Sequence, residues 1–162
     1  MTLNGCLAGL VAITAPCAFV SVEWSAVIGA IAGVLVVVSV LAFDRVRIDD
    51  PVGATSVHLV NGIFGTLCVG LFGDPTLMQE RVVGYSLKGG LLLSGDPGQL
   101  LVQIQGILAT AAYVVVVTAI MWAVIRTICG LRVSQAEELE GLDVGEHGNE
   151  AYYGFVMQSP SH

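Results

Sequence analysis

The composition of this 162-residue chain is that of a membrane protein, with 55% hydrophobic residues and only 12% charged residues. A soluble domain of this length could not bury so much apolar surface, so a soluble class is excluded. The formal charge of −7 argues against nucleic acid as a partner, because phosphate binding needs clustered Lys and Arg.

Four apolar segments, residues 5–22, 25–43, 54–73 and 100–129, are predicted to cross the membrane as helices. Each reaches the ~18–20 residues that a helix needs to span the hydrocarbon core, the first only just. The fourth segment would be roughly 45 Å long as a helix, so it must tilt, kink or project from the membrane. We therefore expect an all-α membrane protein with about four transmembrane helices in residues 1–130.

The first segment could be mistaken for a signal peptide. A signal peptide carries positive charge before its apolar stretch, but the first basic residue of this chain is Arg45. We therefore interpret residues 5–22 as a span of the mature protein.

The six basic residues predict the orientation of the spans. Arg81 and Lys88 lie between the third and fourth segments, on one side of the membrane. The other four lie near the ends of the second and fourth segments, on the opposite side: Arg45, Arg47, Arg126 and Arg132. The positive-inside rule therefore predicts that the loop 44–50 and the C-terminal tail are cytoplasmic.

Asp49 and Asp50 precede Pro51 at the start of the third segment, an arrangement typical of a helix N-terminus. Their carboxylates can accept hydrogen bonds from free backbone N–H groups and complement the positive end of the helix dipole. We expect a structural role, with a part in ordering the mouth of a pore as the alternative.

His58 lies inside the third segment, on a side of the predicted helix that is formed mainly of small or polar residues. Such a face either allows another helix to pack closely, with His58 in an interhelical hydrogen bond, or lines a narrow transport path. The helical wheel leaves both alternatives open. The residues within about 60° of His58 are Ala54, Thr55, Asn61, Gly62, Gly65, Val69 and Phe72.

Metal binding and enzyme activity are not expected. His58 is the only His, Asp or Glu inside a predicted span, so a metal site is not expected there, and no cofactor is predicted. The sequence also lacks a nucleophile–base pair at plausible spacing and a phosphate-binding glycine loop.

Residues 131–162 are predicted to form a separate acidic tail, with no Lys or Arg after Arg132. The stretch SQAEELEGL predicts a short helix capped by Ser134. The following stretch, DVGEHGNEAYYGF, predicts irregular structure.

Several stretches resemble, in order, the C-terminal part of the ammonium transporter family. LNGCLAGLVAITAPCAFV is similar to the family's eighth helix, and DDPVGATSVHLVNGIFGTLCVGLFG to its tenth. GQLLVQIQGILAT with the apolar run after it resembles the eleventh helix, and GLRVSQAEELEGLDVGEHGNEAY resembles the cytoplasmic tail. The resemblance implies the last four helices of an eleven-helix fold, followed by that tail.

The resemblance also implies a homotrimer in which each subunit moves ammonium or ammonia across the lipid bilayer through its own pore. His58 matches the second of two pore histidines that relay protons in the family. Asn61, Gly62 and Gly65 are expected on the same pathway, and Asp50 matches an acidic residue that caps this helix at the cytoplasmic mouth.

The tail of the family contacts the neighbouring subunit, and PII-type signal proteins dock on the cytoplasmic face of many members. The residues on the matching tail motif are Gly141, Leu142, Asp143, His147, Gly148 and Tyr152.

Two functions are therefore predicted. In the first, His58 is a proton-relay residue of an ammonium transporter. In the second, the chain is a truncated, non-transporting membrane module that associates with full-length subunits or a PII-type regulator through its tail. The second follows from the missing partner of His58, since His147 and His162 both lie in the tail.

Overall fold

The computed structural model describes residues 1–77 and 88–151, and every regular element among them is helical. The chain divides into two compact units, the first comprising Met1–Ala112 and the second beginning at Tyr113. The expected all-α class is therefore confirmed for the part of the chain that the structure describes.

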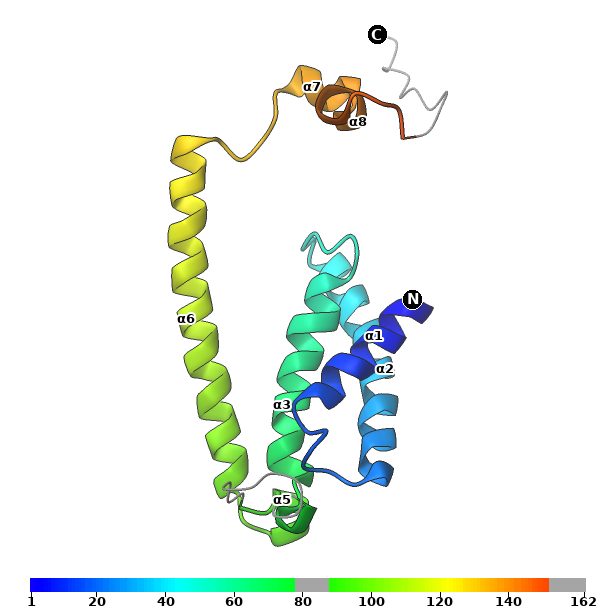
Figure 1. Ribbon diagram of the computed structural model, residues 1–162, viewed down its shortest axis with the longest axis vertical. Helices are drawn as coiled ribbons and strands as arrows, with labels where there is room; N and C mark the ends of the chain where they lie inside the picture. Colours follow the sequence, from blue (N-terminus) through cyan, green and yellow to red (C-terminus); the bar gives the residue numbers. More distant parts are fainter. Residues whose placement is uncertain (78–87, 152–162) are drawn as a thin grey trace. The chain divides into compact units, whose positions relative to one another are not determined.

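Three helical segments pack against one another in the first unit (Figure 1). They are α1 (Thr2–Thr14), α2 (Val22–Arg45) and a third segment, which begins as the π-helix η1 (Thr55–Val60) and continues as α3 (Asn61–Phe72). The third segment contacts both α1 and α2, so its environment depends on both helices.

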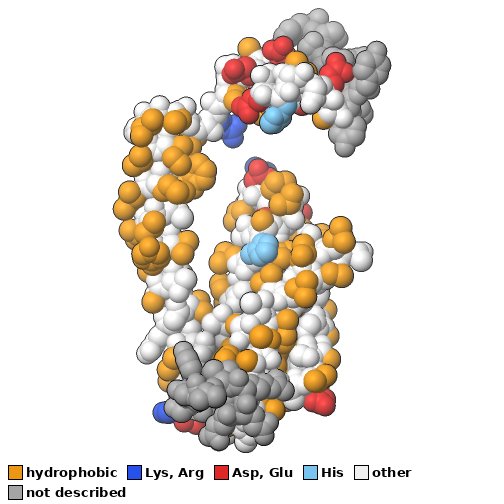
Figure 2. Space-filling model, in the orientation of Figure 1, with side chains coloured by type: hydrophobic (Ala, Val, Ile, Leu, Met, Phe, Trp, Pro, Cys, Tyr) orange, Lys and Arg blue, Asp and Glu red, His pale blue; other side chains and the backbone are white. Residues whose placement is uncertain are grey.

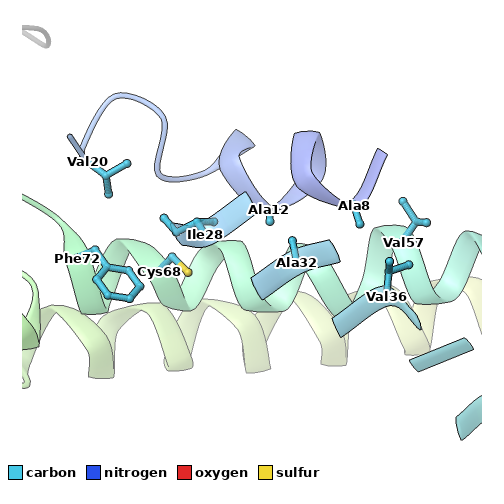
Figure 3. Close-up of a cluster of buried hydrophobic side chains, with 9 residues drawn as sticks. All are labelled: Ala8, Ala12, Val20, Ile28, Ala32, Val36, Val57, Cys68 and Phe72. Atoms are coloured by element: carbon cyan, nitrogen blue, oxygen red, sulfur yellow. The ribbon is translucent and has the colours of Figure 1, made fainter. Parts of the chain in front are cut away.

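The core between these helices is built largely from small side chains, which allow close approach. Ala8 and Ala12 of α1 and Ala32 of α2 are fully buried, and Figure 3 shows them in one cluster beside the third segment. At the end of α3, the ring of Phe72 stacks on Trp24 with 4.4 Å between the ring centroids. The other buried members of the cluster are Val20, Ile28, Val36, Val57 and Cys68.

The first predicted span differs from the structure, because residues 5–22 do not form one helix. The helix α1 ends at Thr14, and its 13 residues are fewer than a span requires. Pro16 follows, and its carbonyl accepts a hydrogen bond from the N–H of Phe19 in a turn. The next helix begins at Val22, where the Ser21 hydroxyl caps α2 by accepting from the N–H of Trp24.

Among the described residues, three helices are long and apolar enough to cross a membrane: Val22–Arg45, Thr55–Phe72 and Gly98–Ile128. Many apolar side chains of the first unit are exposed, and Figure 2 shows them spread over its visible face. On α2, for example, Val34, Val38 and Leu41 are 66%, 56% and 57% exposed. Such a surface suits a bilayer, where apolar side chains face lipid.

The short helix α5 (Leu91–Ser94) precedes α6 (Gly98–Ile128), which agrees closely with the predicted fourth span, 100–129. Near its start, α6 packs tightly on α3, because a Cβ atom added to Gly70 would lie 2.5 Å from Cα of Leu100. No residue of α6 is buried.

The second unit contains two short helices after α6, α7 (Gln135–Glu140) and α8 (Leu142–His147), which contact each other. The predicted cap of α7 is confirmed: Ser134 and Glu137 form a reciprocal capping box. The prediction of irregular structure from Asp143 onward was wrong for residues 143–147, which belong to α8, whereas residues 148–151 are neither helix nor strand and the rest of that stretch lies outside the described residues.

Candidate functional site

The turn that carries His58 is π-helical over Thr55–Val60. In such a turn the backbone hydrogen bonds reach five residues along the chain instead of four, and these turns occur often at functional sites. The wheel drawn at 100° per residue therefore does not hold across this turn. The extra residue changes the side on which residues 55–60 lie relative to α3.

The carboxylate of Asp50 caps the π-helical turn from its N-terminal side, as the sequence predicted. One oxygen accepts from the N–H of Thr55 at 2.9 Å. The other accepts from the N–H of Ser56 at 3.0 Å and from its hydroxyl at 2.9 Å. Desolvation raises the pKa of Asp50, but the bonds from Thr55 and Ser56 outweigh it and hold the pKa below its usual value.

The backbone between Asp50 and the turn reverses direction at Gly53, which has a φ of +73°. The N–H of Gly53 donates to the carbonyl of Asp50 at 2.9 Å. The side-chain amide of Asn4, on α1, donates to the carbonyl of Val52 at 3.3 Å. The cap is thus attached to α1 as well as to the third segment.

Asn61 closes the turn from its C-terminal side. Its side chain is fully buried, and Nδ2 donates to the carbonyl oxygen of Ser56 at 2.9 Å. Its Oδ1 is buried without a hydrogen-bond partner among the described residues. Ser56 therefore holds both ends of the turn: its N–H and hydroxyl bind Asp50, and its carbonyl binds Asn61.

The four predicted pathway residues fall into different environments. His58 is exposed and Gly62 is half-buried, whereas Asn61 and Gly65 are buried. A Cβ atom on Gly65 would collide with the carbonyl oxygen of Ala12, so Gly65 lets α1 approach α3 closely. His58 is exposed in the described part of the chain, and its exposure leaves both the interhelical hydrogen bond and the transport path as predictions.

The predicted tail residues gather on and around α8. Gly141 and Gly148 flank the helix with φ values of +103° and +69°. Inside it, the carboxylate of Asp143 accepts from the N–H of Ala151 at 2.8 Å, and this bond is the main reason that its pKa lies below the usual value. Leu142 and His147 are the first and last residues of α8. Tyr152 lies outside the described residues.

No group of three or more His, Cys, Asp or Glu side chains that could hold a metal ion occurs in residues 1–77 or 88–151. Sequence reasoning missed Ser56, which links the two ends of the turn. The pattern of apolar residues contains no signal for a π-helical turn. A π-helical turn differs from an α-helical turn in its hydrogen bonds and holds one more residue, but it needs no particular composition.

A sequence model of the Ammonium Transporter Family matches residues 1–152. The chain belongs to the ammonium transporter family. This membership, together with the three long apolar helices, makes it a multi-pass membrane protein.

Two curated relatives illustrate the similarity. The chain is 41% identical over 152 residues to an ammonium transporter of Aquifex aeolicus, and the match covers 92% of this chain and 33% of the relative. It is 37% identical over 156 residues to ammonium transporter Amt2 of Archaeoglobus fulgidus, covering 96% of this chain and 33% of the relative. Both relatives are transporters rather than enzymes.

The crystal structure of Saccharomyces cerevisiae Mep2 resembles this chain with a TM-score of 0.74 and 30% sequence identity. The match covers 82% of this chain and 30% of Mep2. The chain thus spans about a third of the length of the relatives that it matches.

Proposed function

We propose that this chain takes part in ammonium transport across a membrane, with His58 as a proton-relay residue on the transport path. The observation that carries the proposal is the exposed position of His58 on a capped π-helical turn within a span. Ionisable groups at membrane depth are costly and tend to mark such paths. A neutral imidazole can accept one proton and donate another, which suits a relay.

The rest of the path is proposed from the same geometry. Gly62 lies one helical turn beyond His58 and is half-buried, so its missing side chain leaves room for a small solute. Asn61 and Gly65 support the path from the buried side of the third segment. Asp50 holds the start of the segment, at the mouth that the positive-inside rule places in the cytoplasm.

The partners are proposed from the family and from the tail. The complete transporter would be a homotrimer, and α8 with Gly141 and Gly148 would form the cytoplasmic surface that contacts a neighbouring subunit or a PII-type signal protein. The described part of the tail, residues 131–151, supports this proposal: the capping box of Ser134 and the bond between Asp143 and Ala151 give α7 and α8 a definite conformation.

The relay is tested with His58→Ala in a hybrid transporter, in which this chain replaces the matching third of the Aquifex aeolicus protein. Uptake and charge movement are measured in proteoliposomes. We expect at least a tenfold loss of one of the two, because the relay group is absent. Leu59→Ala, at the neighbouring exposed position, is the matched control and should leave both unchanged. Unchanged uptake and unchanged charge movement in His58→Ala would contradict the relay.

A second candidate function is that of a non-transporting membrane module. It is favoured by the two short helices of the tail, α7 and α8, which give residues 135–147 a definite conformation. The test is capture of full-length subunits or of a PII-type protein by the 162-residue chain in detergent. Deletion of residues 131–162 should abolish the capture, and equal capture without the tail would reject this function.

A further inference from the structure

We infer that Asn61 is a positioning residue for His58, because its side chain keeps the turn Thr55–Val60 in the π-helical conformation. The inference rests on the proposed relay function of His58. It starts from the hydrogen bonds of Asn61, which differ from those of an ordinary residue at the end of a helical turn.

The backbone of Asn61 does not complete the π-helical pattern. In that pattern its N–H would donate to the carbonyl five residues earlier, which is that of Ser56. It donates instead to the carbonyl of His58, three residues earlier. The Ser56 carbonyl receives the side-chain Nδ2 of Asn61 at 2.9 Å in place of the backbone donor.

The side chain of Asn61 is an unfavourable choice for packing alone. It is fully buried, and its Oδ1 has no hydrogen-bond partner among the described residues. An unpartnered buried oxygen is destabilising, so an apolar side chain of the same size would suit a site that needs only volume. Rotating the amide by 180° would place Oδ1 against the Ser56 carbonyl oxygen, so the observed orientation is the one that the bond requires.

The hydrogen bond between Nδ2 of Asn61 and the carbonyl of Ser56 determines whether the turn is π-helical or α-helical. Without Nδ2, the buried Ser56 carbonyl needs another donor, and the N–H of Val60 can supply it in an ordinary α-helical turn. Closing the turn in this way moves residues 55–60 by one position relative to α3, or about 100° around the helix axis. His58 would then leave the side on which the structure places it.

The first measurement is the ¹⁵N-histidine NMR spectrum of the 162-residue chain in lipid nanodiscs. Asn61→Leu keeps the volume and removes the donor. Asn61→Ser is smaller, and its hydroxyl cannot reach a carbonyl five residues back. Both should shift the His58 ring signals. Thr66→Val is the matched control, because it removes a side-chain bond to a backbone carbonyl on the same helix, that of Gly62 at 2.9 Å.

The second measurement is uptake by the hybrid transporter. Asn61→Leu and Asn61→Ser should each lower uptake at least tenfold and shift its pH profile, whereas Thr66→Val should stay within twofold of the parent. In a His58→Ala background, the Asn61 variants should cause no further loss, because the group that they position is already absent.

The outcomes separate the two proposals. If His58→Ala leaves transport unchanged, the relay function fails, whatever the Asn61 variants do. If His58→Ala impairs transport but both Asn61 variants retain parental uptake and parental His58 signals, only the positioning role is overturned. An equal loss from the Asn61 variants with and without His58 would also overturn it, since that loss would be general destabilisation.

Discussion

The third segment and α6 both have the length and composition of a transmembrane helix, but they differ in their surroundings. Of the third segment, Thr55–Phe72, 44% is buried, whereas no part of α6 is buried. The side-chain hydrogen bonds also differ. In the third segment they define a turn, through Asp50 and Asn61, whereas the Thr118 and Thr127 hydroxyls of α6 bond only to carbonyls three or four residues back.

The difference shows that two helices of similar apolar length can differ in how many of their side chains form specific contacts with neighbouring groups. The exposed apolar side chains of α6 suit contact with lipid, and the helix also contacts α3 near its start, at Leu100. The third segment uses glycine, serine and asparagine at buried positions, where each is required by a neighbouring group. Substitutions that are matched between the two helices should therefore have unequal effects.

The largest difference is expected between Gly65→Ala and Gly106→Ala. A Cβ atom on Gly65 would collide with the backbone carbonyl of Ala12, which cannot move without shifting α1, so we expect a destabilisation of about 3 kcal/mol. A Cβ atom on Gly106 of α6 meets nothing within 4 Å, so that change should be neutral or stabilising by about 0.5–1 kcal/mol. Thermal unfolding in a mild detergent measures both. Equal midpoints would show that α1 and α3 are not in close contact.

A smaller difference is expected between Trp24→Ala and Trp122→Ala. Trp24 stacks on Phe72, and losing the stack and its apolar contacts should cost about 2 kcal/mol. Trp122 of α6 is 53% exposed, so its removal should cost less than about 0.5 kcal/mol. The readout is the midpoint of unfolding in denaturant. A larger effect at Trp122 than at Trp24 would contradict the contrast between the two helices.

The smallest effect at neutral pH is expected from the cap of the third segment. The pKa of Asp50 is held below its usual value, so the carboxylate stabilises the turn at every pH above about 4. The contribution is lost only as the pH falls below about 4, through the lowered pKa. The protection factors of the Thr55 and Ser56 amides, which compare the observed exchange rate with the intrinsic rate at the same pH, should then fall.

The amides in the middle of α6, such as those of Val114 and Thr118, provide the internal control for this acid effect, because they lie far from Asp96, whose carboxylate accepts from the N–H of Gly98 at the start of that helix. Asp50→Asn should lower the protection factors of the Thr55 and Ser56 amides already at pH 6 and make them independent of pH below it. Protection factors in the unsubstituted protein that stay constant down to pH 2 would show that the carboxylate does not hold the turn.

Several elements could be predicted from the sequence because their causes are local. Apolar length indicated the segments that became α2, the third segment and α6, and the Ser134 cap was predicted from its hydroxyl and the following acidic helix. The failures have local causes too. Pro16 ended α1 earlier than apolar composition suggested, and Gly141 allowed α8 to begin where irregular structure was expected.

The candidate site was predicted only in part. His58 and Asp50 were identified because an ionisable residue in an apolar run and a carboxylate before a helix are visible in the sequence. The sequence did not predict that Asn61 and Gly65 are buried whereas His58 is exposed, because the helical wheel assumed one helical period for the whole segment. A single π-helical turn, held by Asp50, Ser56 and Asn61, changes that period without altering composition.

The sequence by itself determined that this chain enters a membrane, that its secondary structure is helical, and that its pattern is that of the ammonium transporter family. These properties depend on composition and on the order of residues, so each segment of the chain contributes to them independently of the others. Only the tertiary structure decided that Asn61 and Gly65 are buried while His58 is exposed. That outcome depends on the contact with α1 and on hydrogen bonds that span five or six residues. Neither can be predicted from the conformational preferences of single residues.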